Sequence, residues 1–480
     1  MGAAFRRLWW AAGISSSGDG LVLVAMPLLA VSLTRSPVLI AGVTAANRAA
    51  AALSSLPGGL LADRVDRRRL MVACNLVAGA VVAGLVAVMS SGTASLAMLY
   101  VVGAVLAACD VTYELAAQAY VPAVVGREQL PKANARLQVV ANSGEQFVGP
   151  GVGGALFALA QRVPFVVDAV SFFLSAVLVR ASRPRPAAAV AGGGSGGARG
   201  SLAAPGADAP AALAPTDGAP AHGTCTSATS ALGPGPADGA PSAPPASTDG
   251  AVAPPGRAPG PGQPGAGTGR STWSGDFLEG WRWFRRERPV QLVAGVVASL
   301  VICQYMVFGI LVVYATRMLH LTSTGYGLFY GFASLLGVLA GFGADRVTRH
   351  LGAGRAILVG FSLVVVSYLG LGFTRTAVLA VFVFGLQDVG TIIGNVGAIT
   401  TRQRLIPTHL YGRVVSIHRL AVAGAAPLGA LLGGVIAGAA GTSTAIVMAG
   451  GLELVFLSLL GPALVRSLSP GSADVPSGGQ

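Results

Sequence analysis

The sequence predicts an all-α integral membrane protein with twelve transmembrane helices in two pseudo-symmetric six-helix bundles. The first observation is composition: 53% of the residues are hydrophobic and 11% are charged, whereas a soluble domain has about 25% charged residues. The second is a series of apolar runs, each near the length of about 20 residues that crosses a bilayer. The third is a charged segment that occurs twice, once in each half.

The apolar runs form two groups of six, separated by a long segment with almost no large apolar residue. The predicted spans of the first group are 8–33, 37–61, 70–90, 93–118, 138–160 and 164–180. Those of the second group are 291–316, 322–343, 354–373, 376–400, 411–437 and 443–465.

The repeated segment reads GGLLADRVDRRRL at 58–70 and GFGADRVTRH at 341–350. The residues in common are Gly59, Asp63 and Arg64 in the first copy and Gly341, Asp345 and Arg346 in the second. Further marker pairs recur at similar separations: Asp110 with Asp388, Arg136 with Arg413, and Pro150 with Pro427. These repeats indicate two related halves, an architecture typical of transporters.

Basic residues are concentrated in the connections after even-numbered spans. These connections hold Arg64, Arg67, Arg68, Arg69, Arg127, Lys132, Arg136, Arg180, Arg183, Arg185, Arg346, Arg349, Arg355, Arg402, Arg404 and Arg413. The connections after odd-numbered spans hold Arg35, Arg162, Arg317 and Arg375. Because basic loops stay on the cytoplasmic side, we expect a multi-pass protein of the cell membrane with both termini in the cytoplasm.

The chain is predicted to divide into four parts. Residues 1–185 form the first bundle and 276–466 the second, with a cytoplasmic tail at 467–480. Residues 186–275 are rich in Ala, Gly and Pro, a composition that cannot bury enough apolar surface to fold, so we expect a disordered cytoplasmic linker. Aromatic and basic residues alternate at 276–289, which predicts a helix lying along the membrane surface.

Several function classes are disfavoured by what the sequence lacks. The one lysine, Lys132, follows a proline, so the chain has no P-loop, and an ion gradient, the substrate's own gradient or a separate subunit must supply energy. The net charge of +13 does not indicate nucleic acid, because the arginines lie in short loops. The four cysteines and five histidines are scattered, so we expect no metal site and no cofactor.

The 58–70 segment resembles the cytoplasmic signature of the major facilitator superfamily. The matching residues are Gly59, Asp63, Arg64, Arg67 and Arg68, while Asp66 stands where a glycine is more usual. The resemblance implies a latch that releases during alternating access, with Asp345 and Arg346 as a partial second copy. Gly59 would allow close helix approach, and Asp63 could meet helix N-termini or loop arginines. Alternatively, these charges only set topology.

The fifth predicted span contains Gly149-Pro150-x-x-Gly153-Gly154, which resembles the motif associated with antiporters of that superfamily. The resemblance implies a hinge that favours exchange, and the segment from Pro427 onward repeats the idea in the eleventh span. A proline removes one backbone hydrogen bond and kinks a helix. A kink that merely packs is the alternative.

Further segments resemble twelve-helix drug and siderophore exporters, the branch of macrolide-efflux and enterobactin exporters. They are Ser17-Gly18-Asp19, the span around Asp110, and Asp168-x-x-Ser171-Phe172. One departure is that no arginine occurs at 93–118, where many drug/proton antiporters carry one that tunes proton coupling. The coupling residues therefore cannot simply be transferred from the family.

Acidic residues inside a membrane are costly and mark functional sites by default. The candidates for proton coupling or for the cavity are Asp19, Asp110, Glu114, Glu145 and Asp388, with Arg48 as a possible partner. Asp110 and Glu114 are four residues apart and share one helix face, so either could carry a proton. The alternative is a satisfied structural role, which leads for Asp168 and Glu453 because they lie near span ends.

The function predicted is proton-linked export of a hydrophobic or amphipathic small molecule, by rocking of the two bundles in the lipid bilayer. We expect a functional monomer. Three alternatives stay open: an importer or uniporter of a metabolite, an integral membrane enzyme, and a non-transporting sensor. An enzyme would need metal-binding carboxylates or histidines at a membrane face, and the loop pair Asp63 and Asp66 is crowded by arginines.

Overall fold

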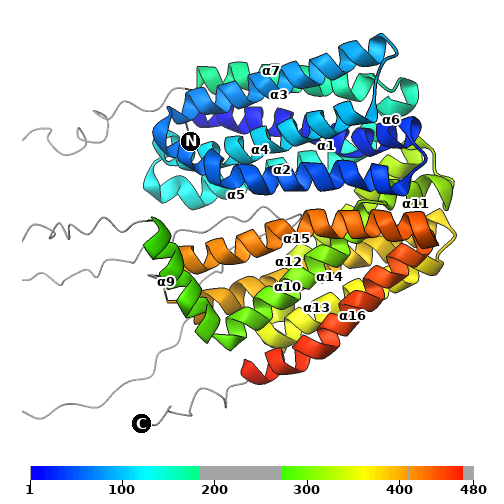
Figure 1. Ribbon diagram of the computed structural model, residues 1–480. Helices are drawn as coiled ribbons and strands as arrows, with labels where there is room; N and C mark the ends of the chain where they lie inside the picture. The colour runs from blue at the N-terminus through cyan, green and yellow to red at the C-terminus, as the bar shows by residue number, and fades with distance from the viewer. Residues whose placement is uncertain (1, 183–272, 408–409, 469–480) are drawn as a thin grey trace, which may run out of the picture.

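The computed structural model describes residues 2–182, 273–407 and 410–468, and within these ranges the chain is helical with no strand (Figure 1). The predicted linker at 186–275 lies outside the described residues except for 273–275, which begin a helix. The predicted tail at 467–480 lies outside them except for its first two residues. The prediction of an all-helical membrane fold with twelve spans is confirmed.

The first half contains six spans that run alternately between the two ends of the bundle. They are α1 (Ala3–Leu33), α2 (Pro37–Arg64), α3 (Arg67–Ser90), α4 (Leu96–Val124), the divided span α5 (Leu130–Asn142) with α6 (Gly149–Leu159), and α7 (Val163–Ala181). A short 3₁₀ turn, η1 (Arg127–Gln129), precedes α5. The ends of α2 and α4 lie three to six residues beyond the predicted spans.

The second half repeats this arrangement after one additional helix, α9 (Trp273–Arg286). Its spans are α10 (Arg288–Phe308) with α11 (Leu311–Arg317), α12 (Ser323–Leu351), α13 (Ala353–Phe373), α14 (Ala377–Leu405), α15 (Tyr411–Ala440) and α16 (Thr442–Ser467). Eleven helical spans of the described part are long and apolar enough to cross a membrane, and the divided fifth span is the twelfth.

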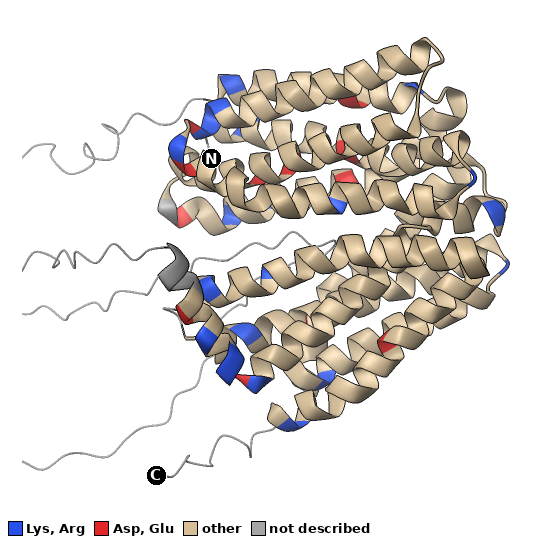
Figure 2. Cartoon of the chain, in the orientation of Figure 1, with Lys and Arg blue, Asp and Glu red and all other residues tan. Residues whose placement is uncertain are grey.

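Helix α1 begins and α16 ends at the same end of the bundle, on the left in Figure 1. Figure 2 shows that most of the lysines and arginines gather there, around the connections that follow even-numbered spans. We call this the basic end, and the other the opposite end. The α9 helix lies across the basic end of the second half.

The fifth span is not the single kinked helix that the sequence predicts. Between α5 and α6 lies a π-helical segment, η2 (Ser143–Val148), in which the Gly149 N–H donates to the carbonyl of Gly144. Pro150 follows in the first turn of α6, where its missing N–H costs least. A π segment is a recognised source of bending, so the break coincides with the predicted hinge motif.

The glycines of this motif place span five directly against two other helices. A Cβ atom on Gly149 or Gly153 would collide with the backbone of Gly20 or Leu21 in α1. A Cβ atom on Gly154 would instead meet the backbone of α12 in the other half. Small residues allow such close approach in lipid, where packing rather than hydrophobicity joins helices.

The second half makes the same set of contacts. Gly429 and Gly433 of α15 lie against the backbone of α10, and Gly434 lies against Ala41 of α2 in the first half. Each of these positions follows its counterpart in span five by 280 residues (429 − 149, 433 − 153 and 434 − 154). The two halves therefore meet through duplicated glycine contacts.

The proline pair does not share this equivalence. Pro150 and Pro427 are 277 residues apart, so Ala430 rather than Pro427 occupies the position that corresponds to Pro150 in the contact pattern. Helix α15 is continuous through Pro427. The two prolines therefore lie in different local structures, a π-bulged span in one half and an unbroken helix in the other.

We expect Gly154→Val to destabilise the protein more than Gly151→Val. The added side chain at position 154 would overlap the α12 backbone, whereas at position 151 the nearest atom, on Leu328, lies 3.9 Å from an added Cβ. Overpacking costs about 1–3 kcal/mol, and both variants pay the same helix propensity. Thermal unfolding midpoints in detergent measure the difference. Equal midpoints would contradict the glycine-mediated contact between the halves.

Candidate functional site: a cavity between the two halves

A cavity of about 650 Å³ lies between the two halves. Its walls come from α1, α2, α4 and α7 on one side and α10, α14 and α15 on the other, with contributions from α3 and η2. The lining reaches Gln403 near the end of α14 and Tyr411 at the start of α15, both at the basic end.

At the opposite end the halves are in contact. The Arg317 guanidinium donates a hydrogen bond to the carbonyl of Arg35 at 2.9 Å, and the glycine contacts of Gly154 and Gly434 lie on the same side. In this conformation the two halves are therefore closed at the opposite end and separated toward the basic end.

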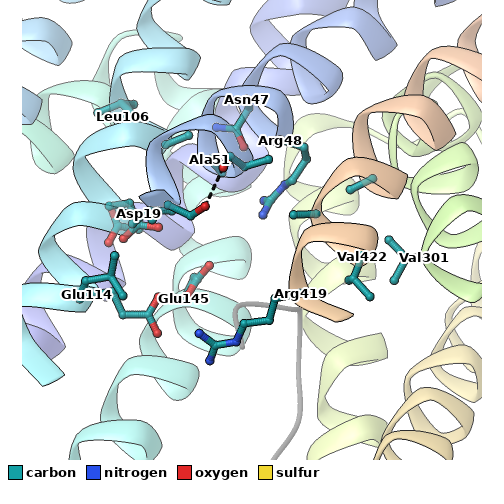
Figure 3. Close-up of a pocket in the computed structure, with 18 of the residues that line it drawn as sticks. Asp19, Asn47, Arg48, Ala51, Leu106, Glu114, Glu145, Val301, Arg419 and Val422 are labelled. Atoms are coloured by element: carbon teal, nitrogen blue, oxygen red, sulfur yellow. Dashed lines mark hydrogen bonds between the residues drawn. The ribbon is translucent and has the colours of Figure 1, made fainter. Parts of the chain in front are cut away.

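Five carboxyl side chains line the cavity, and all five belong to the first half. They are Asp19 of α1, Asp110 and Glu114 of α4, Glu145 of η2 and Asp168 of α7. We call them the acid wall; Figure 3 shows Asp19, Glu114 and Glu145 on one side of the cavity. Four of the five predicted acids are thus brought together, and Asp168, which the sequence assigned to a structural role, joins them.

Two glycines explain how α1 brings Asp19 into the acid wall. A Cβ atom on Gly18 would overlap the side chain of Asp168, and one on Gly20 would overlap the backbone of Glu145. These contacts press α1 against α7 and η2, so that Asp19 lies within electrostatic range of Asp168, Asp110 and Glu145. The Gly-Asp-Gly sequence is what permits three acidic helices to converge.

Arg48 of α2 faces the acid wall from across the cavity. Its guanidinium interacts electrostatically with Asp110 and Glu145, as the sequence suggested for an acid partner. It also lies over the ring of Tyr305, 5.4 Å from the ring centroid. Tyr305 belongs to α10, so this cation–π contact joins the two halves at the cavity.

The second half contributes basic groups that sequence reasoning did not single out. Arg402 of α14 and His418 and Arg419 of α15 line the cavity. Arg419 interacts electrostatically with Glu114 of the first half, and Figure 3 shows it extending toward the acid side. Arg402 was counted as a loop residue, but Arg419 lies inside the predicted span 411–437. An arginine within a span was the signal that could have found it.

Two uncharged groups also present polar atoms to the cavity. Gln304 of α10 is 2% exposed, and its Nε2 has no hydrogen-bond partner among the described residues. The same holds for the Nδ1 atom of His418. A buried donor or acceptor without a partner costs free energy, so these atoms are suited to bind a guest.

Asp388, the fifth predicted acid, does not line the cavity. It is buried in α14, where Gly337 of α12 lies against its Cβ atom. The Gln387 amide donates to Asp388 Oδ1 at 3.1 Å and to Thr391 Oγ1 at 3.2 Å, and Thr391 does line the cavity. Glu453 of α16 is likewise buried away from the cavity.

The first charged segment forms a tight connection at the basic end. Helix α2 ends at Arg64, and Asp66 caps α3 by accepting a hydrogen bond from the Arg69 N–H at 2.8 Å. This N-cap explains why an aspartate can stand where the family more often has glycine. Arg67 donates to the carbonyl of Ala119 in α4 at 2.9 Å, which ties the connection to that helix.

The predicted close approach at Gly59 is wrong for this conformation. Nothing lies within 4 Å of a Cβ atom built there, whereas the preceding Gly58 lies against Thr112 of α4. Asp63 is exposed, and among the described residues no hydrogen bond or ion pair is found for it. Arg64 is exposed as well, and Arg68 is half-buried.

The second charged segment has a different local structure. Helix α12 continues through Asp345 and ends at Leu351, followed by Gly352 with a φ of 78°. The expectation of a repeated turn is therefore wrong: this copy is the last part of a helix. Asp345 pairs with Arg349 one turn on rather than with Arg346.

The structure brings together two cysteines that are far apart in sequence. Cys74 of α3 and Cys109 of α4 both line the cavity, and their thiols lie close enough to interact. Both are free, as is Cys303, which is fully buried in α10 and does not line the cavity. Cys225 lies outside the described residues.

Two related six-helix halves that enclose a cavity closed at one membrane face define a multi-pass membrane transporter that works by alternating access. A family model described as the Major Facilitator Superfamily matches residues 8–426. The chain belongs to this superfamily.

One characterised relative and several solved structures are similar to the chain. Over 158 residues it is 32% identical to the enterobactin exporter EntS of Shigella boydii serotype 4 (strain Sb227). That match covers 32% of this chain and 37% of the exporter, so it spans little more than a third of that protein.

The structural likenesses cover nearly the whole chain at low identity. The nucleoside transporter NupG aligns with a TM-score of 0.65 at 9% identity, over 97% of this chain and 100% of its own. A bacterial homologue of the human lysosomal transporter Spinster, inward-facing and unoccupied, aligns with a TM-score of 0.64 at 13% identity, over 98% of both chains. At these identities the likeness shows the fold.

We expect N-ethylmaleimide to modify Cys109 faster than Cys303 in the folded protein. Cys109 is partly exposed on the cavity wall, whereas Cys303 is 0% exposed behind it. Mass spectrometry of peptides after brief exposure measures both rates, with Cys225→Ser as the background. Equal rates in the folded protein would contradict the placement of the cavity.

Proposed function

We propose that this transporter is a proton-linked exporter of a hydrophobic or amphipathic small molecule, such as a drug, an antibiotic or a siderophore. The observation that carries the proposal is the acid wall: five carboxyl groups from one half, gathered in the cavity and opposed by arginines from both halves. Ionisable groups inside a membrane are typical of proton relays. The partial match to an enterobactin exporter supports the direction of transport.

The exchange follows from having protons and cargo compete for one wall. With the cavity accessible from the basic end, an amphipathic cargo binds between apolar residues of both halves and the polar atoms of Gln304 and His418. Rocking of the halves then exposes the cavity at the opposite end. There the cargo leaves and a proton binds a carboxylate such as Asp19 or Asp110. The proton is released after the return.

The membrane orientation of the proposal rests on charge. The basic end carries the arginine-rich connections, and such loops are retained in the cytoplasm. The protein then lies in the cell membrane with both termini inside, and the cavity loads from the cytoplasm. One chain supplies both walls of the cavity, which supports a functional monomer.

The 58–70 segment is proposed to act as a latch at the basic end. In the present conformation Arg67 holds it to α4, while Asp63 is exposed. When the halves close there, Asp63 gains a partner on the second half and stabilises the closed state. Gly59, with open space beside it, gives room for that approach.

The motif of span five is proposed to act as the hinge. The π segment η2 and Pro150 interrupt the regular hydrogen bonding of the helix, and Gly154 is the point of contact with the other half. Bending at this position moves Glu145, which lies in η2, together with the gate. Pro427 lacks the π segment and is expected to contribute less.

Transport in reconstituted vesicles tests the coupling. The cargo is chosen by a susceptibility panel in a host that lacks its own pumps. We expect Asp19→Asn and Asp110→Asn to lower transport driven by an imposed pH gradient at least tenfold, because they remove proton sites from the cavity. Asp388→Asn is the matched control, since it removes an acid behind the wall and should retain most of the activity.

Two outcomes would overturn the proposal. Cargo movement that is indifferent to an uncoupler would exclude proton coupling. Cells that lose cargo when the gene is deleted would show import, because removing an exporter raises the internal concentration.

A further inference from the structure

Helix α9 has two distinct faces. Leu278, Trp281, Arg282, Arg285 and Arg286 are all exposed, and their spacing places them on one side of the helix. Figure 2 shows this helix as a concentration of basic residues at the basic end. Exposed tryptophan and leucine beside three arginines is the pattern of a helix lying at the boundary between headgroups and acyl chains.

The other face of α9 is fixed to the second half. Gly280 lies against the Arg413 backbone and side chain of α15. Trp283 and Phe284 pack on an apolar cluster, listed here by its buried members Val290, Ile406, Leu410, Val414 and Val415. The Gln291 side chain of α10 donates to the Phe284 carbonyl at 2.8 Å. The helix is therefore docked, and its exposed face has a defined direction.

An ion pair connects α9 to the helix that borders the cavity. Glu279 pairs with Arg413 in the first turn of α15. In that same part of α15, Tyr411 and Val415 line the cavity. A force on α9 is thus transmitted to the edge of the cavity through one salt bridge and one glycine contact.

We propose that the exposed face of α9 binds the headgroups of anionic phospholipids and that this binding positions the start of α15 at the cavity. Arg282, Arg285 and Arg286 supply charge complementarity to phosphate, while Trp281 and Leu278 enter the acyl boundary. Arginine is suited to this role because its guanidinium can bind phosphate oxygens in pairs. This role is independent of the cargo and of the direction of transport.

Quenching of tryptophan fluorescence tests the lipid contact. The full chain is reconstituted in vesicles containing either brominated phosphatidylglycerol or brominated phosphatidylcholine. The signal of Trp281 is taken as the difference from Trp281→Phe. We expect at least twofold stronger quenching by the anionic lipid, decreasing with added salt because exposed charges are screened.

Charge variants distinguish binding from simple proximity. The triple variant Arg282→Gln, Arg285→Gln and Arg286→Gln should remove the preference for the anionic lipid, and the corresponding triple Lys variant should keep it. A control that neutralises Arg35, Arg162 and Arg375 at the opposite end should not change it. Equal quenching by the two lipids in the unmodified chain would overturn the proposal.

A probe on α15 tests the coupling. Ser416→Cys carries a bimane fluorophore at a position that is exposed and lines the cavity. Its emission should change when phosphatidylcholine is replaced by phosphatidylglycerol, and the change should be lost in Glu279→Gln. A lipid response that survives Glu279→Gln would refute the transmission through this ion pair, even if the lipid contact itself is confirmed.

Discussion

The close contact of α1 with η2, α6 and α7 is the interaction on which the cavity depends. Gly18, Gly20, Gly149 and Gly153 remove the side chains that would hold these helices apart. In lipid, where apolar side chains gain little by leaving their surroundings, such backbone approach is a main source of helix association. Because Asp19 lies between two of these glycines, the same contact that joins the helices also gathers the acid wall.

Gathering acids inside a membrane is costly, and the fold offsets this cost in a specific way. Arg48 extends from the first half toward Asp110 and Glu145, while Arg419 extends from the second half toward Glu114. One of these arginines moves with the acids and the other moves against them. Separation of the halves therefore changes the electrostatic surroundings of Glu114 more than those of Asp110, and a conformational change alters the charge balance of the cavity.

The sequence was sufficient for the spans and for most of the acid wall, because both depend on local composition. It could not assign Asp388 and Asp110 to different surroundings, although they are repeat partners. The face that a helix turns toward the cavity depends on its neighbours: Gly337 of α12 covers Asp388, whereas Asp110 faces open space. Arg402 and Arg419 were missed for the same reason, since their composition is that of orienting arginines.

The local structure of the repeats was also beyond the sequence. Asp66 ends one charged segment with a helix cap, whereas the second copy has no equivalent cap and α12 runs on to Leu351. The π segment before Pro150 forms where backbone groups are pressed against α1, a tertiary effect that residue preferences do not contain. Hydrophobic length predicts where a helix crosses the membrane, but capping and packing decide where it ends.

The duplication has been retained in mechanics and lost in chemistry. The glycine contacts that join the halves recur at a constant separation of 280 residues, so both sides of the interface use the same pivot. The carboxyl groups at the cavity all lie in the first half, and those of the second, Asp388 and Glu453, are enclosed by their own helices. A symmetric pivot allows both ends to open by similar motions. An asymmetric cavity lets one half hold protons while the other supplies the arginines that move against them.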